Sequence, residues 1–444
     1  MLQKIIKNLS IYSLMLIAIL FLGFYLRQDK LYTWPRLGAT FDEYAWTWEG
    51  MNLIQKGVPI SWSPHPEYKN YKNIIYQQTH FRIVTPFLEH PPVFGLVAGG
   101  FAILNGASDM YHLSINNIRP LAVILGVLSI FLVYLLTKEI YEEKVAVMAS
   151  LLYATIPTVV VGSRIVQNEN FFIPVWLLTL FLIVKYIKTK NDLLRNIAFV
   201  LCILLVLAKI PWVAASGSVF LIFLYLKQYK NALLFFTAPI IGLLIFVAYG
   251  YYYDSHLFIS LWGLQLNRYD LTFNSIFALF QKPYLVDRFL TDGWIYFGWF
   301  AAILVFARDV RKNYVIIFAL LSYFVIFLAG IPDEPSHGWY RYPFYPFLVI
   351  SIALFIKEYY IKNWVLSFVF LVVVGTSLLE LTWRQKFGFS YLIFRLSIIS
   401  WGSSLFPLLT PYKNVNKFGK LVCYTWFVIF IFLNVWAVHL YNEQ

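Results

Sequence analysis

The chain has 444 residues, of which 60% are hydrophobic, 20% aromatic and only 13% charged, and its formal net charge is +13 at pH 7. Soluble domains are about half apolar and about a quarter charged, so these values exclude an ordinary soluble protein as well as a disordered chain, a collagen and a coiled coil. The basic residues form short clusters between apolar runs rather than one basic face. This pattern is typical of membrane topology signals and excludes nucleic acid as a partner.

Apolar stretches along the chain predict an all-α polytopic membrane protein, because about 17–25 mainly apolar residues cross the hydrocarbon as a helix. The stretches at 196–208 and 294–307 are short, so the expected number of membrane-spanning helices is eleven to thirteen. The segment Val93–Asn105 is too short to cross and is expected to form a re-entrant or interfacial helix. The predicted spans are 9–26, 119–137, 145–161, 171–187, 196–208, 212–226, 232–250, 294–307, 314–331, 342–356, 363–381, 391–409 and 421–440.

The distribution of Lys and Arg predicts which ends of these helices face the cytosol. The short connections on the side of the N-terminus are strongly basic, as at Lys138, Lys188 and Arg308, and such an excess marks the cytoplasmic side. The N-terminus is therefore expected inside the cell and, with thirteen spans, the C-terminus outside. The first apolar stretch lacks a small-residue cleavage site, which predicts a retained anchor.

No polar linker divides the chain, so residues 1–444 are expected to form one domain in the membrane, most simply the plasma membrane. Its two long connections, 27–117 and 251–292, both fall on the extracytoplasmic side, and residues 383–444 form C-terminal helices with no assigned role. Long loops in a compact protein are often functional, so the chemistry is expected on this side.

The first long connection contains an amphipathic helix that opens at Asp42-Glu43 and ends at Gly57. Its aromatic and apolar face predicts a helix that lies flat at the membrane surface. Two interpretations of its start remain open. Asp42 is either an N-cap beside a first-turn Glu43, or a general base or metal ligand that serves an attacking hydroxyl group. Spacing alone does not decide between them.

Two further polar sites lie on the same predicted side. His90 precedes Pro91 and Pro92 at a helix start, where it is either a polar helix entry or a contact for phosphate or metal in the pocket of Asp42. Arg164 and Glu169 join the third and fourth spans. They are expected to form a local salt bridge, or Glu169 is a second acid near Asp42.

Cations on this side are candidates for binding a phosphate. Arg341, at the start of the tenth span, can snorkel to the interface or hold a phosphate with its guanidinium group. Lys209 follows the fifth span, and Arg268 lies in the second long connection.

These motifs resemble, in their order, the membrane-embedded GT-C glycosyltransferases. The similar branch groups the dolichyl-phosphate-mannose protein mannosyltransferases with the bacterial aminoarabinose lipid A transferases. The resemblance covers roughly residues 10–225 and returns around 338–347. Its elements are the acidic pair after the first span, the His-Pro-Pro helix start, Ser163-Arg164 with Glu169, the lysine after the fifth span, and Arg341-Tyr342 followed by Pro346.

The resemblance implies the GT-C fold and an inverting enzyme that moves a monosaccharide from a polyprenyl-phosphate donor to a glycan, lipid or protein acceptor on the extracytoplasmic or lumenal face. By position, Asp42 resembles the catalytic or metal-binding aspartate of the family, Glu43 its companion and Glu169 the second acid. The donor phosphate would be held by Arg341, Lys209, His90, Arg164 and Arg268. A divalent metal ion, where one is used, would be held by Asp42, Glu169 and His90.

The sequence departs from two subgroups of the GT-C family. Two other functions were also considered. The chain has no evident room for the soluble MIR domain of eukaryotic protein mannosyltransferases, and it lacks the Trp-Trp-Asp-Tyr-Gly sequence of oligosaccharyltransferases. A transporter or lipid flippase would carry ionisable residues at mid-span and internal repeats, and neither is evident in the sequence. A non-catalytic assembly subunit would tolerate the loss of Asp42.

Overall fold

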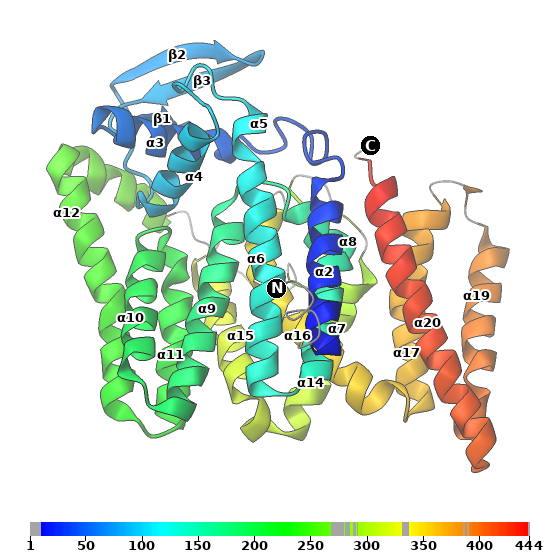
Figure 1. The fold of residues 1–444 in the computed structure, drawn as a ribbon. Coiled ribbons are helices and arrows are strands. Elements are labelled where there is room, and N and C mark those ends of the chain that lie inside the picture. Colours follow the sequence, from blue (N-terminus) through cyan, green and yellow to red (C-terminus); the bar gives the residue numbers. More distant parts are fainter. Residues whose placement is uncertain are drawn as a thin grey trace, which may run out of the picture.

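The computed structural model describes residues 10–267, 279, 285–286, 290, 292–330, 337–384, 387–388 and 390–442. In this part of the chain, long helices pack side by side into one bundle, and a small group of helices and strands covers one end of it (Figure 1). We call this end, which carries α3, α4 and the β-sheet, the loop end. The long helices are α2 (Ile11–Gln28), α6 (Pro120–Ile140), α7 (Glu143–Thr155), α9 (Asn168–Thr189), α10 (Asp192–Val206), α11 (Val213–Tyr225), α12 (Tyr229–Asn267), α14 (Gly293–Arg308), α15 (Val310–Gly330), α16 (Tyr345–Phe355), α17 (Trp364–Leu379), α19 (Tyr391–Ser404) and α20 (Lys413–Leu440).

Each predicted span falls on a helix of the bundle. Among the described residues, 9 helices are long and apolar enough to cross a membrane, and 3 shorter apolar helices of 10–17 residues accompany them. The chain is therefore an integral, multi-pass membrane protein. Short helices connect or extend the long ones: α5 (Ile115–Ile118), α8 (Pro157–Gly162), η1 (Ile210–Trp212), η2 (Gly338–Phe344), η3 (Ile356–Tyr360), η4 (Glu380–Arg384) and η5 (Phe406–Leu409).

Two connections differ from the prediction. The span predicted at 145–161 is broken, because Ile156 precedes Pro157 and adopts an extended ψ of 124°, so α7 ends and α8 begins there. The second long connection, predicted to start at residue 251, is helical through Asn267, since α12 continues past a kink at Asp254. Residues 268–278, including the predicted phosphate ligand Arg268, lie outside the described part of the chain.

The group at the loop end contains two helices and a sheet. Helix α3 (Asp42–Lys56) ends at Gly57, whose φ of 70° is the left-handed conformation that stops a helix, and α4 (Val93–Leu104) is the predicted short apolar helix. The three antiparallel strands have the order β1-β3-β2 and span Ser61–Trp62 (β1), Tyr71–Tyr76 (β2) and Thr79–Val84 (β3). This sheet was not among the predicted elements.

Helix α3 is buried more deeply than a helix lying flat on a membrane surface would be. Every residue from Glu43 to Asn52 is buried, because α4 packs on one side and the sheet on another (Figure 1). Ser61 of β1 donates a hydrogen bond to the carbonyl of Ala45 at 2.6 Å, and the indole of Trp48 donates to the carbonyl of Met110 at 2.9 Å. The start of α3 is therefore held from several sides.

The contact between α3 and α4 depends on glycines at the crossing point. A Cβ atom on Gly50 would lie 1.7 Å from the carbonyl oxygen of Gly95, and one on Gly99 would lie 2.2 Å from the backbone nitrogen of Met51. The two backbones thus meet directly, as small residues allow. Any side chain at these positions would force the helices apart.

We expect Gly50→Ala to destabilise the fold by about 1–3 kcal/mol, as overpacked cores do. Gly100→Ala, on α4, is the matched control, because its Cβ would meet only Ile54 Cδ1 at 3.5 Å and alanine favours helix. Thermal unfolding in detergent should give a lower midpoint for Gly50→Ala and an equal or higher one for Gly100→Ala. Equal midpoints for the two variants would contradict the close contact.

Candidate active site

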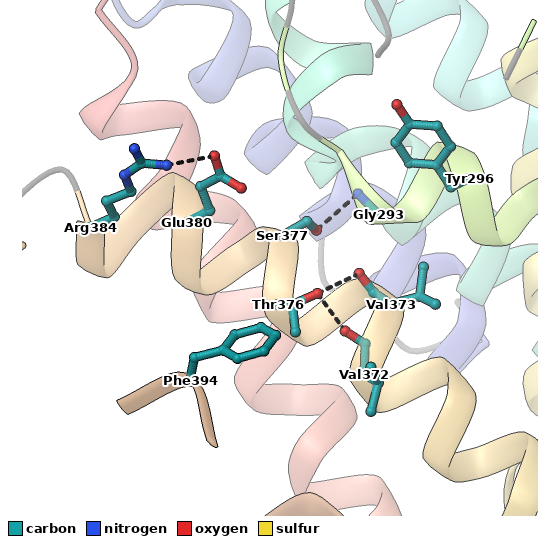
Figure 2. Close-up of a pocket in the computed structure, with 9 residues that line it drawn as sticks. All are labelled: Gly293, Tyr296, Val372, Val373, Thr376, Ser377, Glu380, Arg384 and Phe394. Atoms are coloured by element: carbon teal, nitrogen blue, oxygen red, sulfur yellow. Dashed lines mark hydrogen bonds and ion pairs between the residues drawn. The ribbon is translucent and has the colours of Figure 1, made fainter. Parts of the chain in front are cut away.

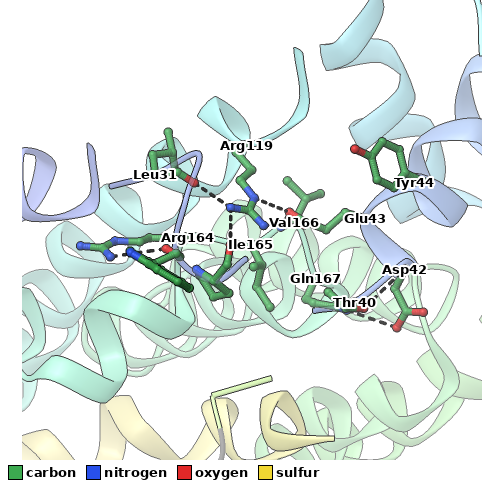
Figure 3. A network of polar contacts seen from close by, with 12 residues as sticks. Leu31, Thr40, Asp42, Glu43, Tyr44, Arg119, Arg164, Ile165, Val166 and Gln167 are labelled. Carbon is green, nitrogen blue, oxygen red and sulfur yellow. Dashed lines mark hydrogen bonds and ion pairs between the residues drawn. The ribbon is translucent and has the colours of Figure 1, made fainter. Parts of the chain in front are cut away.

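Asp42 opens the first turn of α3 at the rim of the bundle. Its Oδ2 accepts a hydrogen bond of 3.2 Å from the side-chain amide of Gln167, which lies just before α9 (Figure 3). The N-cap position belongs to Phe41, and no side chain caps the helix, so Asp42 is not the N-cap. The half-exposed carboxylate faces the start of α9 instead, with Oδ1 left for another partner.

Glu43 is fully enclosed and forms a two-pronged ion pair with Arg119, which precedes α6. Nε of Arg119 lies 3.2 Å from Oε1 and Nη2 lies 3.1 Å from Oε2, and the backbone nitrogen of Val166 donates to Oε1 at 3.0 Å (Figure 3). Nη1 of Arg119 donates to the carbonyls of Leu31 and Pro35. Both side chains are about 1% exposed, so this geometry favours a structural role for Glu43.

Glu169 lies in the first turn of α9, directly after the segment that binds Asp42 and Glu43. It is fully buried, and its Oε1 is 2.8 Å from Nζ of Lys209, which precedes η1. The predicted local salt bridge between Arg164 and Glu169 is therefore wrong, because Lys209 takes that place. Gln167, which binds Asp42, lies two residues before Glu169, so the second acid follows directly on the segment that contacts the first.

The segment η2 completes this group of charges. The ammonium of Lys209 lies 4.7 Å from the centre of the Tyr340 ring, a cation–π contact, and Tyr340 is held by a hydrogen bond from Tyr323 to its carbonyl. Arg341 follows and is 5% exposed; its charge and that of Glu169 both act on Tyr323. The structure thus brings Asp42, Glu169, Lys209 and Arg341 together from four separate segments. We call this group the charged mouth.

His90 contacts Trp46, which lies one helical turn along α3 from Asp42. The two ring centres are 4.7 Å apart with the ring planes tilted by 53°, and the indole of Trp46 donates to Gln167 at 3.4 Å. The backbone nitrogen of Val93 bonds to the carbonyl of Leu207 at 3.0 Å, which ties this end of α4 to the segment carrying Lys209. His90 therefore borders the charged mouth.

Arg164, predicted to bind phosphate, lies behind the charged mouth. It is fully buried and donates to the carbonyls of Leu26 and Trp34 at 2.8 and 3.4 Å. Arg27 is also fully buried and donates to the carbonyls of Tyr153 and Ala154. Both arginines fasten α2 to its neighbours through carbonyl oxygens at helix ends, where the helix dipole favours a cation.

The acids of the charged mouth do not form an evident metal site. No group of three or more His, Cys, Asp or Glu side chains in the described ranges is arranged to hold a metal ion. One oxygen of Glu169 is already bound to the ammonium group of Lys209, and the ring of His90 packs at a tilt against the indole of Trp46. The described residues thus show no preformed metal site, and a divalent metal ion held by Asp42, Glu169 and His90 stays a prediction.

Several residues of the site were not singled out from the sequence. Gln167 orients Asp42, Arg119 pairs with Glu43, and Tyr340 covers Lys209. Arg119 carried a usable signal, because a charge directly before a membrane span needs a partner.

Helix α3 also carries Glu49, whose two carboxylate oxygens have no hydrogen-bond partner among the described residues. Burial and the neighbouring Glu89 raise the pKa of Glu49 well above its ordinary value.

A pocket of about 450 Å³ opens between α14, α17, η4 and α19 (Figure 2). Apolar side chains, among them Val372, Val373 and Phe394, form much of its lining. Tyr296, on which the charge of Arg341 acts, stands at one end, and the ion pair of Glu380 and Arg384 stands at another. The walls of the pocket are therefore mainly apolar, and polar side chains lie at its ends.

Comparisons with known proteins identify one matching family model and solved structures of similar fold. Residues 89–252 match the model of a family described as dolichyl-phosphate-mannose-protein mannosyltransferase. A search of curated protein sequences finds no significant match to the chain.

Solved structures share the fold. ArnT from Cupriavidus metallidurans bound to undecaprenyl phosphate is 12% identical, with a TM-score of 0.52 over 96% of this chain and 77% of that one. The oligosaccharyltransferase AglB from Archaeoglobus fulgidus, in complex with an inhibitory peptide and a dolichol-phosphate, is 13% identical, with a TM-score of 0.51 over 93% of this chain. The chain spans 59% of the length of that protein. The protein therefore has the GT-C fold, as the sequence resemblance predicted.

Removing the charge of Glu43 should destabilise the fold rather than only the chemistry. We expect Glu43→Gln to lower the free energy of unfolding by about 3–5 kcal/mol, because it leaves the buried Arg119 without its counter-charge. Asp42→Asn is the matched control, since its half-exposed side chain makes one hydrogen bond. Thermal unfolding should show a large loss for Glu43→Gln and a small one for Asp42→Asn; the reverse order would contradict the assignment of Glu43.

Proposed function

We propose that the protein is an inverting glycosyltransferase that moves a monosaccharide from a polyprenyl-phosphate donor to an acceptor hydroxyl group at the charged mouth. One observation carries this proposal: four distant segments, which carry Asp42, Glu169, Lys209 and Arg341, meet through the contacts of Gln167 with Asp42, of Lys209 with Glu169 and of Lys209 with Tyr340. The match to a mannosyltransferase family model, and the polyprenyl phosphates held by two structures of the same fold, support it.

Asp42 is assigned the role of general base. The acceptor oxygen attacks the anomeric carbon of the sugar while its proton passes to Oδ1 of Asp42. Attack from the face opposite the phosphate inverts the configuration at that carbon. The hydrogen bond from Gln167 to Oδ2 fixes the carboxylate, and the buried pair of Glu43 and Arg119 fixes the turn that carries it.

Lys209 and Arg341 are assigned to the leaving group. As the bond between the sugar and the phosphate breaks, its electron pair stays on the phosphate oxygen, and a nearby cation stabilises that charge. Arg341 offers a planar guanidinium group suited to phosphate, and Lys209 offers a compact charge that Glu169 and Tyr340 hold in place. Glu169 thus acts as a positioning residue for Lys209.

The donor also needs an apolar site for its isoprenoid tail. The pocket beside Tyr296 supplies apolar walls within electrostatic reach of Arg341, and its volume of about 450 Å³ is that of a ligand pocket. A tail in this pocket would place its phosphate near the charged mouth.

We assign the loop end to the extracytoplasmic side. The opposite ends of the helices carry Lys138, Lys188, Lys227 and Arg308, an excess of basic residues typical of the cytoplasmic face. The end of α20 lies at the loop end, where Lys30 donates to the carbonyl of Tyr441 at 3.1 Å (Figure 1). This agrees with a C-terminus outside the cell.

The role of Asp42 predicts a selective loss of turnover. Asp42→Asn should lower sugar transfer by about a hundredfold or more, the usual contribution of a positioned base, with near-normal thermal unfolding. Transfer is measured with a panel of radiolabelled polyprenyl-phosphate sugars and cell-envelope acceptors in detergent. Asp109→Asn, an exposed carboxylate of the same connection paired with His112, is the control and should keep its activity. Undiminished transfer by Asp42→Asn would refute the assigned base.

The role of Arg341 predicts weaker binding of the donor headgroup. Arg341→Gln should raise the Kd for a short-chain polyprenyl phosphate by about tenfold or more, because a charged hydrogen bond to phosphate is lost. Arg308→Gln removes an exposed arginine at the opposite end of the bundle and should leave the Kd unchanged. Titration in detergent with tryptophan fluorescence measures both, and equal Kd values for the two variants would contradict the assignment.

A further inference from the structure

A second hollow lies on the other side of the first turn of α3 from Asp42. Residues two apart on a helix point in nearly opposite directions, so Asp42 faces Gln167 while Tyr44 faces the β2–β3 hairpin. Figure 3 shows the two side chains leaving α3 in different directions. We call this space the aromatic hollow. Its walls include Phe41, Tyr44, Tyr76, Gln77, Thr79 and Phe81.

The walls of the aromatic hollow are mainly rings. Phe41 meets Phe81 edge-on at 5.0 Å between ring centres, and Tyr44 meets Tyr76 at 5.5 Å with the ring planes 74° apart. Phe41 and Tyr76 are only partly buried, so part of each ring surface stays open. Such edge-to-face pairs fix the rings as rigid apolar surfaces.

The polar group of the hollow is the amide of Gln77. Its Oε1 accepts from the hydroxyl of Tyr44 at 2.8 Å, and its Nε2 donates to the hydroxyl of Tyr76 at 3.3 Å. An amide offers two acceptor sites and two donor hydrogens, so one of each remains for a ligand. The two tyrosines hold this amide in a fixed direction at the mouth of the hollow.

The backbone that presents Gln77 is strained. Tyr76 pairs with Thr79, so Gln77 and Gln78 form a two-residue hairpin turn, and both have positive φ values of 49° and 62°. Such turns prefer Asn-Gly, because a long side chain in the left-handed region costs energy. Strain of this kind gathers at ligand sites. A binding role for the Gln77 amide over the aromatic hollow explains why a glutamine occupies this strained position.

The chemistry of the hollow selects a neutral ligand with hydroxyl groups and an apolar face. All of its lining residues are uncharged, which disfavours a phosphate or an ionic peptide. Its volume is about 70 Å³, so the hollow is small and suits contact with one face of a single ring. A sugar ring has C–H groups on its face for the aromatic rings and hydroxyl groups at its edge for the amide.

We propose that the aromatic hollow binds one sugar ring of a glycan acceptor, a little removed from the hydroxyl group that reacts at Asp42. This inference rests on the proposed function and names its acceptor class. Because Phe41 lines the hollow and directly precedes Asp42, a glycan chain held there passes over the rim of α3 into the charged mouth.

Gln77→Gly tests the proposal with a matched control in the next residue. Both Gln77→Gly and Gln78→Gly place glycine at a positive φ and so relieve strain, but only Gln77 lines the hollow. The full-length protein in detergent is mixed with cellotetraose, mannotetraose, chitotetraose or maltotetraose, and saturation-transfer NMR measures binding. At least one oligosaccharide should bind, with its Kd raised fivefold or more by Gln77→Gly and unchanged by Gln78→Gly.

Kinetics separate this inference from the proposed function. With a glycan acceptor, Gln77→Gly should raise the acceptor KM fivefold or more at unchanged kcat, while the Kd for polyprenyl phosphate stays at the wild-type value. Binding of none of the four oligosaccharides, or equal effects of the two glycine variants, would overturn the hollow as a sugar site. Absence of any sugar transfer by the wild-type protein, with oligosaccharide binding still dependent on Gln77, would instead refute the proposed function.

Discussion

The buried ion pair of Glu43 and Arg119 is the constraint on which the candidate site depends. Removing two charges from water costs several kcal/mol per ion, and the cost is offset only where geometry and further hydrogen bonds are good. Here both prongs are formed. The remaining group of Arg119, Nη1, donates to the carbonyls of Leu31 and Pro35, and the backbone nitrogen of Val166 donates to the carboxylate of Glu43. One pair thereby fixes the end of α2, the start of α3, the start of α6 and the turn before α9. The groups assigned to chemistry lie on these same segments.

The different roles assigned to Asp42, Glu43 and Glu169 follow from this arrangement. Glu43 points inward and is saturated with hydrogen bonds, whereas Asp42 is half-exposed and keeps one oxygen free of them. Glu169 is also buried and holds Lys209 through Oε1, while its Oε2 has no hydrogen-bond partner among the described residues. The site therefore contains an acid for proton transfer, an acid for the scaffold and an acid that positions a cation. Residue type alone does not distinguish these roles, since all three are carboxylates near helix starts.

Hydropathy predicted the helices of the bundle because each segment must hide its own backbone from lipid. Family resemblance predicted Asp42, Glu169, Lys209 and Arg341, which the structure brings together, although their roles remain predictions. The surroundings of Arg164 were not predicted, because the carbonyls that it contacts, of Leu26 and Trp34, cannot be recognised in a residue pattern. The sheet was missed because Gln77-Gln78 gives none of the usual hairpin turn signals. Gln167 and Arg119 required three-dimensional neighbours to be recognised.

The glycine contact between α3 and α4 belongs to a part of the loop end that tolerates few substitutions, whereas the β2–β3 hairpin tolerates more. The α3–α4 contact leaves no space for a methyl group at Gly50, Gly95 or Gly99. The packing of the helix that carries Asp42 therefore tolerates almost no substitution at these positions. Strand β2, by contrast, is mostly exposed and meets the rest of the chain mainly through β3. Substitutions in the β2–β3 hairpin are therefore expected to change the acceptor preference, while the residues assigned to sugar transfer stay the same.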